Sequence, residues 1–193
     1  MNVGLVVEGP TDEAVYRALL PRIRNNLGAL QVRPCGGKSK LKHSFVGHLK
    51  EFQRNTAWQI DAALIIRDSD CHLPLPIEQQ LRQVLNASGF TPNFPVEFFA
   101  TPCMLESWLV SDIGAIRAVA GGRGANSEAD LEHLLIAPQQ SADDDDTFNR
   151  VLIQLGLPRT PAVYSEIASA VDFALVRERC GYFREFCRRV ELH

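Results

Sequence analysis

The sequence predicts an α/β fold: a parallel sheet of about four strands flanked by helices, followed by a C-terminal all-helical extension. In the first half of the chain, short apolar runs rich in β-branched residues alternate with segments of helical periodicity. Strands that alternate with helices of this length form a parallel sheet covered by helices on both faces. After Pro102 only helical periodicity continues, which predicts the extension.

The first half contains four expected strands and three expected helices. The strands are apolar runs, of which "AALII" is the clearest buried strand, and we expect them at Val3–Val7, Leu30–Pro34, Ala62–Ile66 and Val96–Ala100. The helices each have one apolar stripe and are expected at Asp12–Asn25, His43–Arg54 and Pro76–Ala87.

The second half predicts five helices, at Leu105–Asp112, Glu128–Leu135, Asp146–Leu155, Pro161–Leu175 and Val176–Val190. We therefore expect an α/β core over residues 1–103 and a helical extension over residues 104–193. The extension is expected to pack on the core, so that the chain forms a single compact unit.

Composition limits the classes of protein. Hydrophobic residues make up 46% and charged residues 22% of the 193 residues, as in an ordinary globular protein. With a net charge of −3, any binding of nucleic acid must rest on a local basic patch. Neither a membrane helix nor a secretory signal is expected, which favours a cytoplasmic location without a membrane partner. The five cysteines include no pair with the spacing of zinc or redox sites, so reduced thiols are expected.

Acidic residues follow two of the expected strands. Glu8 comes directly after the first strand, and Asp68 and Asp70 come after the third. The carboxyl ends of parallel strands meet at one edge of a sheet. Asp68 and Asp70 are two residues apart on an extended segment, so both should point the same way. Such a cluster is stable when a cation neutralises it or a proton is retained, and carboxylate oxygens select Mg²⁺ or Mn²⁺. The alternative is that Asp68 and Asp70 cap the next helix or line a hydrated loop.

A local excess of positive charge lies in the segment 37–54. The glycine pair before Lys38 would let backbone N–H groups and the ammonium approach a phosphate, so Lys38 is the best candidate to stabilise charge there. The alternative is a solvated helix face with a flexible lead-in. The candidate nucleic-acid-binding residues are Lys38, Lys40, Lys42, Lys50 and Arg54. A second basic cluster is interleaved with glutamates, which predicts a salt-bridged helix; it contains Arg177, Arg179, Arg184, Arg188 and Arg189.

Two motifs carry a resemblance to a known family. "VVEGPTDE" followed by "LIIRDSD" resembles the Toprim domain, the metal-dependent module of topoisomerases, bacterial-type primases and overcoming-lysogenization-defect nucleases, over roughly residues 2–102. The form "EGPTD" looks more like the nuclease branch, which implies that Asp12 and Glu106 also join the metal site. "PCMLESWLVSDIGAI" is similar to the Glu-x-Trp-Leu-x-x-Asp signature of small stand-alone Toprim-like proteins, grouped as domain of unknown function 4276. The pattern of that family has a lysine soon after a tyrosine, whereas Tyr164 is followed here by Ser165 and Glu166.

The residues and the resemblance together predict a metal-dependent nuclease that hydrolyses phosphodiester bonds in DNA or RNA. Glu8, Asp68, Asp70 and Lys38 are the candidate catalytic residues, with Glu8 either a metal ligand or a general acid or base. One or two Mg²⁺ or Mn²⁺ ions would be held by Glu8, Asp12, Asp68, Asp70 and Glu106. The resemblance implies a setting in phage defence or mobile-element biology, with a partner ATPase or other defence-system protein, and leaves an oligomer open. The alternative is a non-catalytic Toprim-like binding subunit that acts only with a partner protein.

Overall fold

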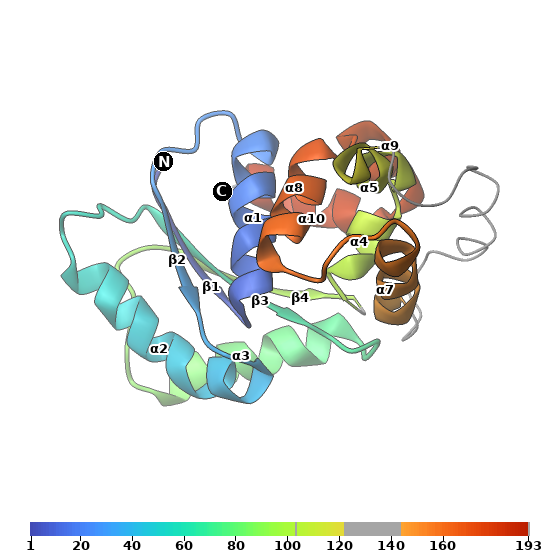
Figure 1. The fold of residues 1–193 in the computed structure, drawn as a ribbon. Coiled ribbons are helices and arrows are strands. Elements are labelled where there is room, and N and C mark those ends of the chain that lie inside the picture. Colours follow the sequence, from blue (N-terminus) through green and yellow to red (C-terminus); the bar gives the residue numbers. More distant parts are fainter. Residues whose placement is uncertain (103, 122–143, 193) are drawn as a thin grey trace.

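Four parallel strands form the centre of the molecule (Figure 1). The computed structural model describes residues 1–102, 104–121 and 144–192 of the chain. The strands are β1 (Val3–Val7), β2 (Leu30–Pro34), β3 (Ala62–Asp68) and β4 (Val96–Thr101). Their order across the sheet is β2-β1-β3-β4, and every neighbouring pair is parallel. The predicted α/β fold with a four-stranded parallel sheet and a helical C-terminal part is confirmed.

Three helices connect the strands. They are α1 (Pro10–Ile23), α2 (Lys38–Arg54) and α3 (Pro74–Ala87). Two boundaries differ from expectation in a way that matters for the site. Helix α2 begins at Lys38 and not at His43, so Lys38, Lys40 and Lys42 lie on the first helical turns and not in a flexible lead-in. Strand β3 continues to Asp68 because it stays paired with β4 up to Thr101.

The described residues of the second half of the chain are helical, as expected, but the helices are divided differently. They are α4 (Glu106–Val110), α5 (Ile113–Ala120), α7 (Asp144–Gln154), α8 (Pro161–Ala170), α9 (Phe173–Arg179) and α10 (Gly181–Leu192). The helix expected at Glu128–Leu135 lies outside the described residues.

The expected continuous helices Pro161–Leu175 and Val176–Val190 are wrong. Helix α8 ends at Ala170 because the carboxylate of Asp172 accepts the backbone N–H groups of Ala174 and Leu175 and so begins α9. Helix α9 in turn ends at Arg179, and Cys180 has an extended backbone. A side chain that caps a helix competes locally with apolar periodicity, which carries no signal of the break.

The sheet separates two apolar cores. Side chains alternate along β1, so that Leu5 and Val7 face α1 and the C-terminal helices, whereas Val6 faces α2 and α3. The core on the α1 side is continuous with the helical half, because Trp108 of α4 packs against Tyr16 of α1 with ring centroids 6.1 Å apart. The indole of Trp108 is therefore part of the core, and it fixes α4 against the sheet.

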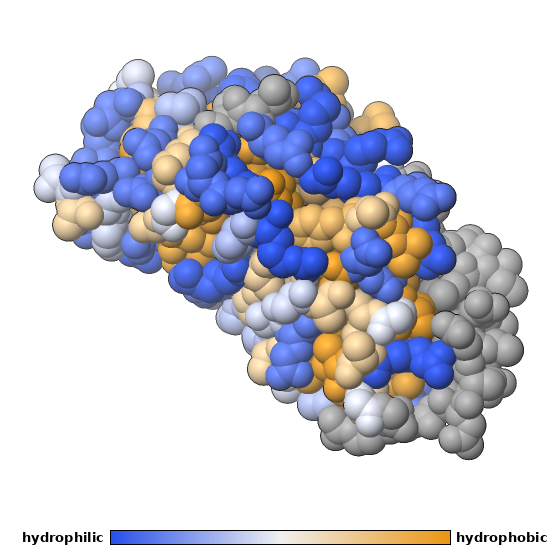
Figure 2. All heavy atoms as spheres, turned by 90° about the horizontal axis from the view of Figure 1, so that it is seen from above, coloured by the Kyte–Doolittle hydropathy of each residue, from blue (hydrophilic) through white to orange (hydrophobic). Residues whose placement is uncertain are grey.

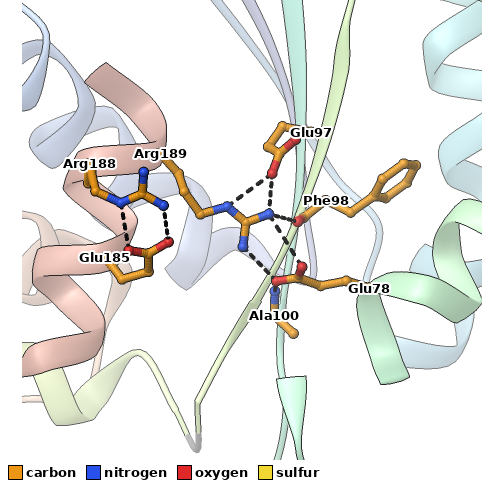
Figure 3. Close-up of polar contacts among 7 residues, drawn as sticks. All are labelled: Glu78, Glu97, Phe98, Ala100, Glu185, Arg188 and Arg189. Carbon is orange, nitrogen blue, oxygen red and sulfur yellow. Dashed lines mark hydrogen bonds and ion pairs between the residues drawn. The ribbon is translucent and has the colours of Figure 1, made fainter. Parts of the chain in front are cut away.

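The C-terminal helix α10 is tied to the free edge of β4 by Arg189 (Figure 3). Its guanidinium donates to the carbonyl oxygen of Phe98 at 2.6 Å and to Oε1 of Glu97 at 3.0 Å. It also donates to Oε1 of Glu78 on α3 at 2.8 Å, and the same oxygen accepts the backbone N–H of Ala100 at 3.1 Å. The edge groups of β4 at Phe98 and Ala100 are thus satisfied within the chain, which protects this edge from pairing with another strand.

The second arginine cluster forms salt bridges, as predicted, but its members lie on two helices, α9 and α10, and not on one. Arg188 pairs with Glu185 at 2.6 Å, and Arg177 pairs with Glu191 at 2.6 Å. Arg179 donates to the carbonyl oxygen of Ser111 at 2.9 Å, at the end of α4. Arg177 and Arg179 therefore connect different elements of the helical half, whereas the pair of Arg188 lies within α10.

Figure 2 shows the face seen from above the view of Figure 1, where hydrophilic residues cover most of the surface and hydrophobic residues appear in patches between them. Among the helices of the described ranges, none combines the length and the apolar character needed to cross a membrane.

Candidate metal centre

The first two predicted site residues meet at the carboxyl edge of the sheet. Glu8 follows β1 directly, and Asp68 is the last residue of the neighbouring strand β3. The backbone N–H of Asp68 donates to Oε1 of Glu8 at 2.9 Å, across sixty residues of sequence. The parallel pairing of β1 with β3 produces this contact, because it places both strand ends on one side of the sheet.

The glycine pair after β2 positions Glu8. The N–H groups of Gly36 and Gly37 donate to the carbonyl oxygen of Glu8 at 2.7 and 2.8 Å. Their φ angles of 79° and 119° lie in the left-handed region, which glycine adopts at little cost. The expectation that these N–H groups approach a phosphate is therefore wrong, since both are bonded to the chain itself. The pair instead fixes the backbone from which the Glu8 carboxylate projects.

Asp12 lies on the same edge, in the first turn of α1. Gly9 is the N-cap of this helix and Pro10 opens it, which suits a position where no backbone N–H is needed. The Oδ2 atom of Asp12 accepts the N–H of Gly9 at 2.8 Å. The segment "EGPTD" therefore brings a second carboxylate back toward the end of β1.

The carboxylates at this edge lie close enough to shift one another's pKa values. Burial raises the pKa of Glu8 to about 7, and Asp12 adds to this, against the lowering effect of the Asp68 N–H and Lys38. Burial also raises the pKa of Asp68 well above its usual range, and the charges of Asp12, Glu106 and Glu8 raise it further. The pKa of Asp12 is raised by burial as well. Without a further cation, the folded protein favours protons on these groups.

This arrangement predicts that the metal-free protein loses stability as the pH rises. The folded-state pKa of Glu8, about 7, lies above the ordinary value of 4.5, so the folded state binds this proton more tightly than the unfolded state does. The stabilisation is fully present below pH 4.5 and is lost as the pH rises to about 7. In chelator, the free energy of unfolding should fall by roughly 3 kcal/mol over this window because of Glu8 alone.

Urea titrations at several pH values would measure this dependence. Glu8→Gln should flatten the pH profile, whereas Glu13→Gln, in the first turn of α1, should leave it unchanged. An unfolding free energy that rises through this window for the wild type relative to Glu8→Gln would contradict the prediction.

Asp70 does not point with Asp68. The chain leaves the extended conformation after Asp68, and Asp70 has a φ of 50°. The turn is closed by the N–H of His72, which donates to the carbonyl oxygen of Ser69 at 2.9 Å. The expectation of two like-pointing carboxylates on an extended segment is therefore wrong. The carboxylate of Asp70 instead forms an ion pair with Lys38 at the start of α2.

The alternative interpretation of this segment as a helix cap also fails. The N-cap of α3 is Leu73, and no side chain caps that helix end.

Cys71, next to Asp70, is disulfide-bonded, so the expectation that all cysteines are reduced is wrong for this residue. Spacing along a sequence does not reveal a disulfide, which depends on the distance between two Cβ atoms in the fold.

Glu106 reaches the same carboxyl edge from beyond the outer strand β4. It opens α4 just after β4, and its side chain is 12% exposed. The hydroxyl of Tyr164 on α8 donates to its Oε1 at 3.3 Å, and Nη2 of Arg159 lies 3.8 Å from the same oxygen. The sequence analysis missed Arg159, because its place between two prolines in a short connector gives no periodic or motif signal.

The predicted basic residues separate along α2. Lys38 and Lys40 lie in its first turn, at the carboxyl edge of the sheet. The helix rises 1.5 Å per residue, so Arg54 lies about 24 Å away at its other end. There Arg54 lines a groove with Glu51, which is itself paired with Arg33 at 2.7 Å. The structure therefore brings the first lysines of α2 to the carboxylates but leaves Lys50 and Arg54 distant.

The donor chemistry of this edge fits a hard divalent cation. Glu8, Asp12, Asp68 and Glu106 offer only carboxylate oxygens, and their mutual repulsion favours a cation among them. Within residues 1–102, 104–121 and 144–192, no three His, Cys, Asp or Glu side chains are already arranged to hold a metal ion together. Binding a metal would thus draw these side chains closer than they lie in the structure.

An apolar pocket at the opposite end of the sheet offers no competing site. It is lined mainly by apolar side chains, which include Met1, Val3, Leu20 and Leu27, and its volume is about 30 Å³. The charged groups described above therefore lie at the carboxyl edge and not at this pocket.

The sequence matches the family described as Domain of unknown function (DUF4276) over residues 7–191. The chain belongs to this family. The DUF4276 chain also resembles the C-terminal region of the OLD protein of Xanthomonas campestris pv. campestris, with a TM-score of 0.51 and 14% identity over 97% of this chain and 96% of that one. At this identity the similarity is one of fold. No curated protein matches the chain.

The structure explains the Glu-x-Trp-Leu-x-x-Asp segment of this DUF4276 protein. Only Glu106 faces the carboxylate cluster, whereas Trp108 and Leu109 are core residues. Asp112 is buried and accepts the N–H groups of Ala115 at 3.1 Å and Asp172 at 2.7 Å. Three of the four named positions therefore hold α4, α5 and α9 in place so that the fourth reaches the site.

Proposed function

We propose that this DUF4276 protein is a Toprim-type nuclease that hydrolyses phosphodiester bonds of DNA or RNA with a divalent metal. The proposal rests on one observation. Carboxylates that follow three neighbouring strands lie close together, and the charges of Asp12, Glu106 and Glu8 all raise the pKa of Asp68. A folded chain retains such a cluster at a cost in stability, and a bound cation removes that cost.

The metal would be Mg²⁺ or Mn²⁺, as one or two ions, held by Glu8, Asp12, Asp68 and Glu106. When bound, such ions polarise phosphoryl oxygens and neutralise the charge that develops on them. Asp70 has a different role in this proposal, because its carboxylate holds the ammonium of Lys38 beside the cluster. Lys38 would then bind a non-bridging phosphate oxygen. With its pKa of about 7, Glu8 is also suited to exchange a proton at neutral pH if it is not a ligand.

The substrate would approach along the start of α2. Lys38, Lys40 and Lys42 lie in its first turns, where their charge offsets the acidity of the site toward a polyanion. Lys50 and Arg54 would contact a more distant part of the same backbone. The motif resemblance to overcoming-lysogenization-defect nucleases and the similarity of fold to the OLD protein support this substrate class. The same resemblance supports a setting in phage defence, with a partner ATPase.

Cleavage assays with purified full-length protein test the proposal. Labelled single- and double-stranded DNA and RNA should be cut in Mg²⁺ or Mn²⁺ and left intact in chelator. Titration calorimetry with Mn²⁺ in the absence of nucleic acid should detect one or two sites. A folded protein that neither binds Mn²⁺ nor cleaves any member of this panel would refute the nuclease.

One observation favours a second candidate, a Toprim-like subunit that binds a partner and cuts nothing alone. The Lys38–Asp70 ion pair already neutralises one of the five predicted metal-site carboxylates. In that case calorimetry would find no metal site, and the protein would copurify with its partner. Metal binding followed by cleavage only in the presence of that partner would instead indicate a conditional nuclease.

A further inference from the structure

Two buried hydroxyl groups meet at the carboxyl edge of the sheet, on the face that α1 covers. The hydroxyl oxygen of Tyr16 on α1 lies 3.3 Å from Oγ1 of Thr101, the last residue of β4. Tyr16 is 1% exposed and Thr101 is 0% exposed, so neither hydroxyl is open to bulk water. Both groups must therefore find their hydrogen-bond partners within the protein.

The aromatic core holds the Tyr16 hydroxyl in this place. The ring of Tyr16 packs edge-to-face on Trp108, with centroids 6.1 Å apart, and its centroid lies 5.7 Å from that of Phe186. All three side chains are almost fully buried. In a close-packed core the ring of Tyr16 has little freedom to move, so its hydroxyl stays beside β4.

Asp68 lies beside Thr101 on the same face of the sheet. The two residues are register partners in the parallel pair of β3 and β4, and the N–H of Ser69 donates to the carbonyl oxygen of Thr101 at 2.8 Å. Side chains two residues apart on a strand point to one face, and Ile66 and Phe99 both belong to the core on the α1 side. The carboxylate of Asp68 and the hydroxyl of Thr101 therefore project from neighbouring strands toward α1.

The two hydroxyls carry two protons, and their mutual contact uses one of them. Whichever group donates in that contact, the other hydroxyl keeps a proton to donate. Burial raises the pKa of Tyr16 well above its usual range, and among the neighbouring carboxylates the charge of Asp68 raises it most. A carboxylate is also a strong hydrogen-bond acceptor. The carboxylate of Asp68 is thus the acceptor best placed for the remaining proton.

We propose that Tyr16 and Thr101 are positioning residues whose paired hydroxyls donate one hydrogen bond to the Asp68 carboxylate and so fix the direction in which it faces a divalent cation. This inference rests on the proposed function, because it concerns the orientation of a ligand of the proposed metal site. Hydrogen bonds of this kind hold a ligating side chain in one orientation, and their loss commonly weakens metal binding by about 10- to 100-fold.

A double-mutant cycle tests the hydrogen bond to Asp68 without any metal. Tyr16→Phe and Asp68→Ala, alone and together, would be compared by urea denaturation in chelator at one fixed pH. Tyr16→Phe should lower the folding equilibrium constant about tenfold by itself, but less than about threefold when it is combined with Asp68→Ala. Thr101→Val removes the other hydroxyl at nearly the same volume and should show the same coupling.

Titration calorimetry with Mn²⁺ tests the consequence for the metal site. Tyr16→Phe and Thr101→Val should each weaken Mn²⁺ binding about tenfold or more, whereas Thr101→Ser keeps a hydroxyl and should stay within about threefold of the wild type. Ser111→Ala is the matched control, because Ser111 is 1% exposed and its hydroxyl donates to the carbonyl oxygen of Ser107 at 2.7 Å. It should destabilise the fold without changing the Mn²⁺ affinity, which is the result expected of a purely structural hydroxyl.

The two measurements separate this inference from the proposed function. Additive effects in the cycle, or wild-type Mn²⁺ affinity in both Tyr16→Phe and Thr101→Val, would overturn the inference even if the wild type cleaves nucleic acid. Coupling in the cycle, together with a wild-type protein that binds no Mn²⁺, would support the hydrogen bond to Asp68 and refute only the metal-binding proposal.

Discussion

Replacing Glu8 by glutamine, or Asp68 by asparagine, is expected to reduce metal-dependent cleavage by about a thousandfold or more while the fold survives. Both side chains lie at the centre of the carboxylate cluster, where the N–H of Asp68 donates to Glu8 at 2.9 Å. Each substitution keeps the shape of the side chain but removes one negative charge, and with it the strongest attraction for a divalent cation. The affinity for Mn²⁺ should therefore fall together with the rate.

Single-turnover cleavage and Mn²⁺ calorimetry on the same preparations would measure both effects. In chelator at neutral pH the two variants should melt at higher temperatures than the wild type, because an amide escapes the burial cost and repulsion that raise the pKa of these carboxyl groups in the folded state. Glu13→Gln is the matched control: Glu13 is a nearby carboxylate in the first turn of α1, but it pairs with Arg17 at 2.8 Å. If Glu8→Gln and Asp68→Asn cleave at wild-type rates, the cluster is not the catalytic site.

Replacing Arg189 by methionine is expected to destabilise the protein by about 3–5 kcal/mol, the largest effect on folding among our predictions. The side chains of Arg189, Glu78 and Glu97 are 19%, 12% and 21% exposed (Figure 3). Methionine fills a similar volume but leaves both carboxylates without their cation and the carbonyl oxygen of Phe98 without its donor. The cost arises mainly from these unpaired groups and not from the lost ion pairs themselves.

Urea denaturation at neutral pH would measure this loss. Arg188→Ala should cost less than about 1 kcal/mol, because its pair with Glu185 is exposed on both sides. Adding Glu78→Gln and Glu97→Gln to Arg189→Met should recover part of the stability, since the uncompensated charges are then gone. A cost for Arg189→Met no larger than that for Arg188→Ala would show that the cluster in Figure 3 is effectively solvated.

The fold class followed from periodicity, and so did the meeting of Glu8 with Asp68. Hydrophobic periods of two and of 3.6 residues are local properties that a sequence displays directly. Once β1 and β3 were expected in one parallel sheet, their carboxyl ends had to share an edge. The contact between two residues sixty positions apart could thus be predicted without coordinates.

The direction of the side chains could not be predicted in this way. Asp70 turns to Lys38 because the chain enters the left-handed region after β3, and no spacing rule reveals that turn. The N–H groups of Gly36 and Gly37 are used by the backbone of Glu8, which depends on how closely β2 and β1 end together.

The sequence by itself determined the sheet, its strands and the acidic character of one edge, because these follow from local patterns of apolar and charged residues. Only the tertiary structure decided which cations face that edge and which are used elsewhere. Arg159 reaches Glu106 from a connector fifty-three residues away, whereas Arg189 is used to close the edge of β4. The sequence specifies the charge of each side chain, but packing between distant segments determines which partner that charge meets.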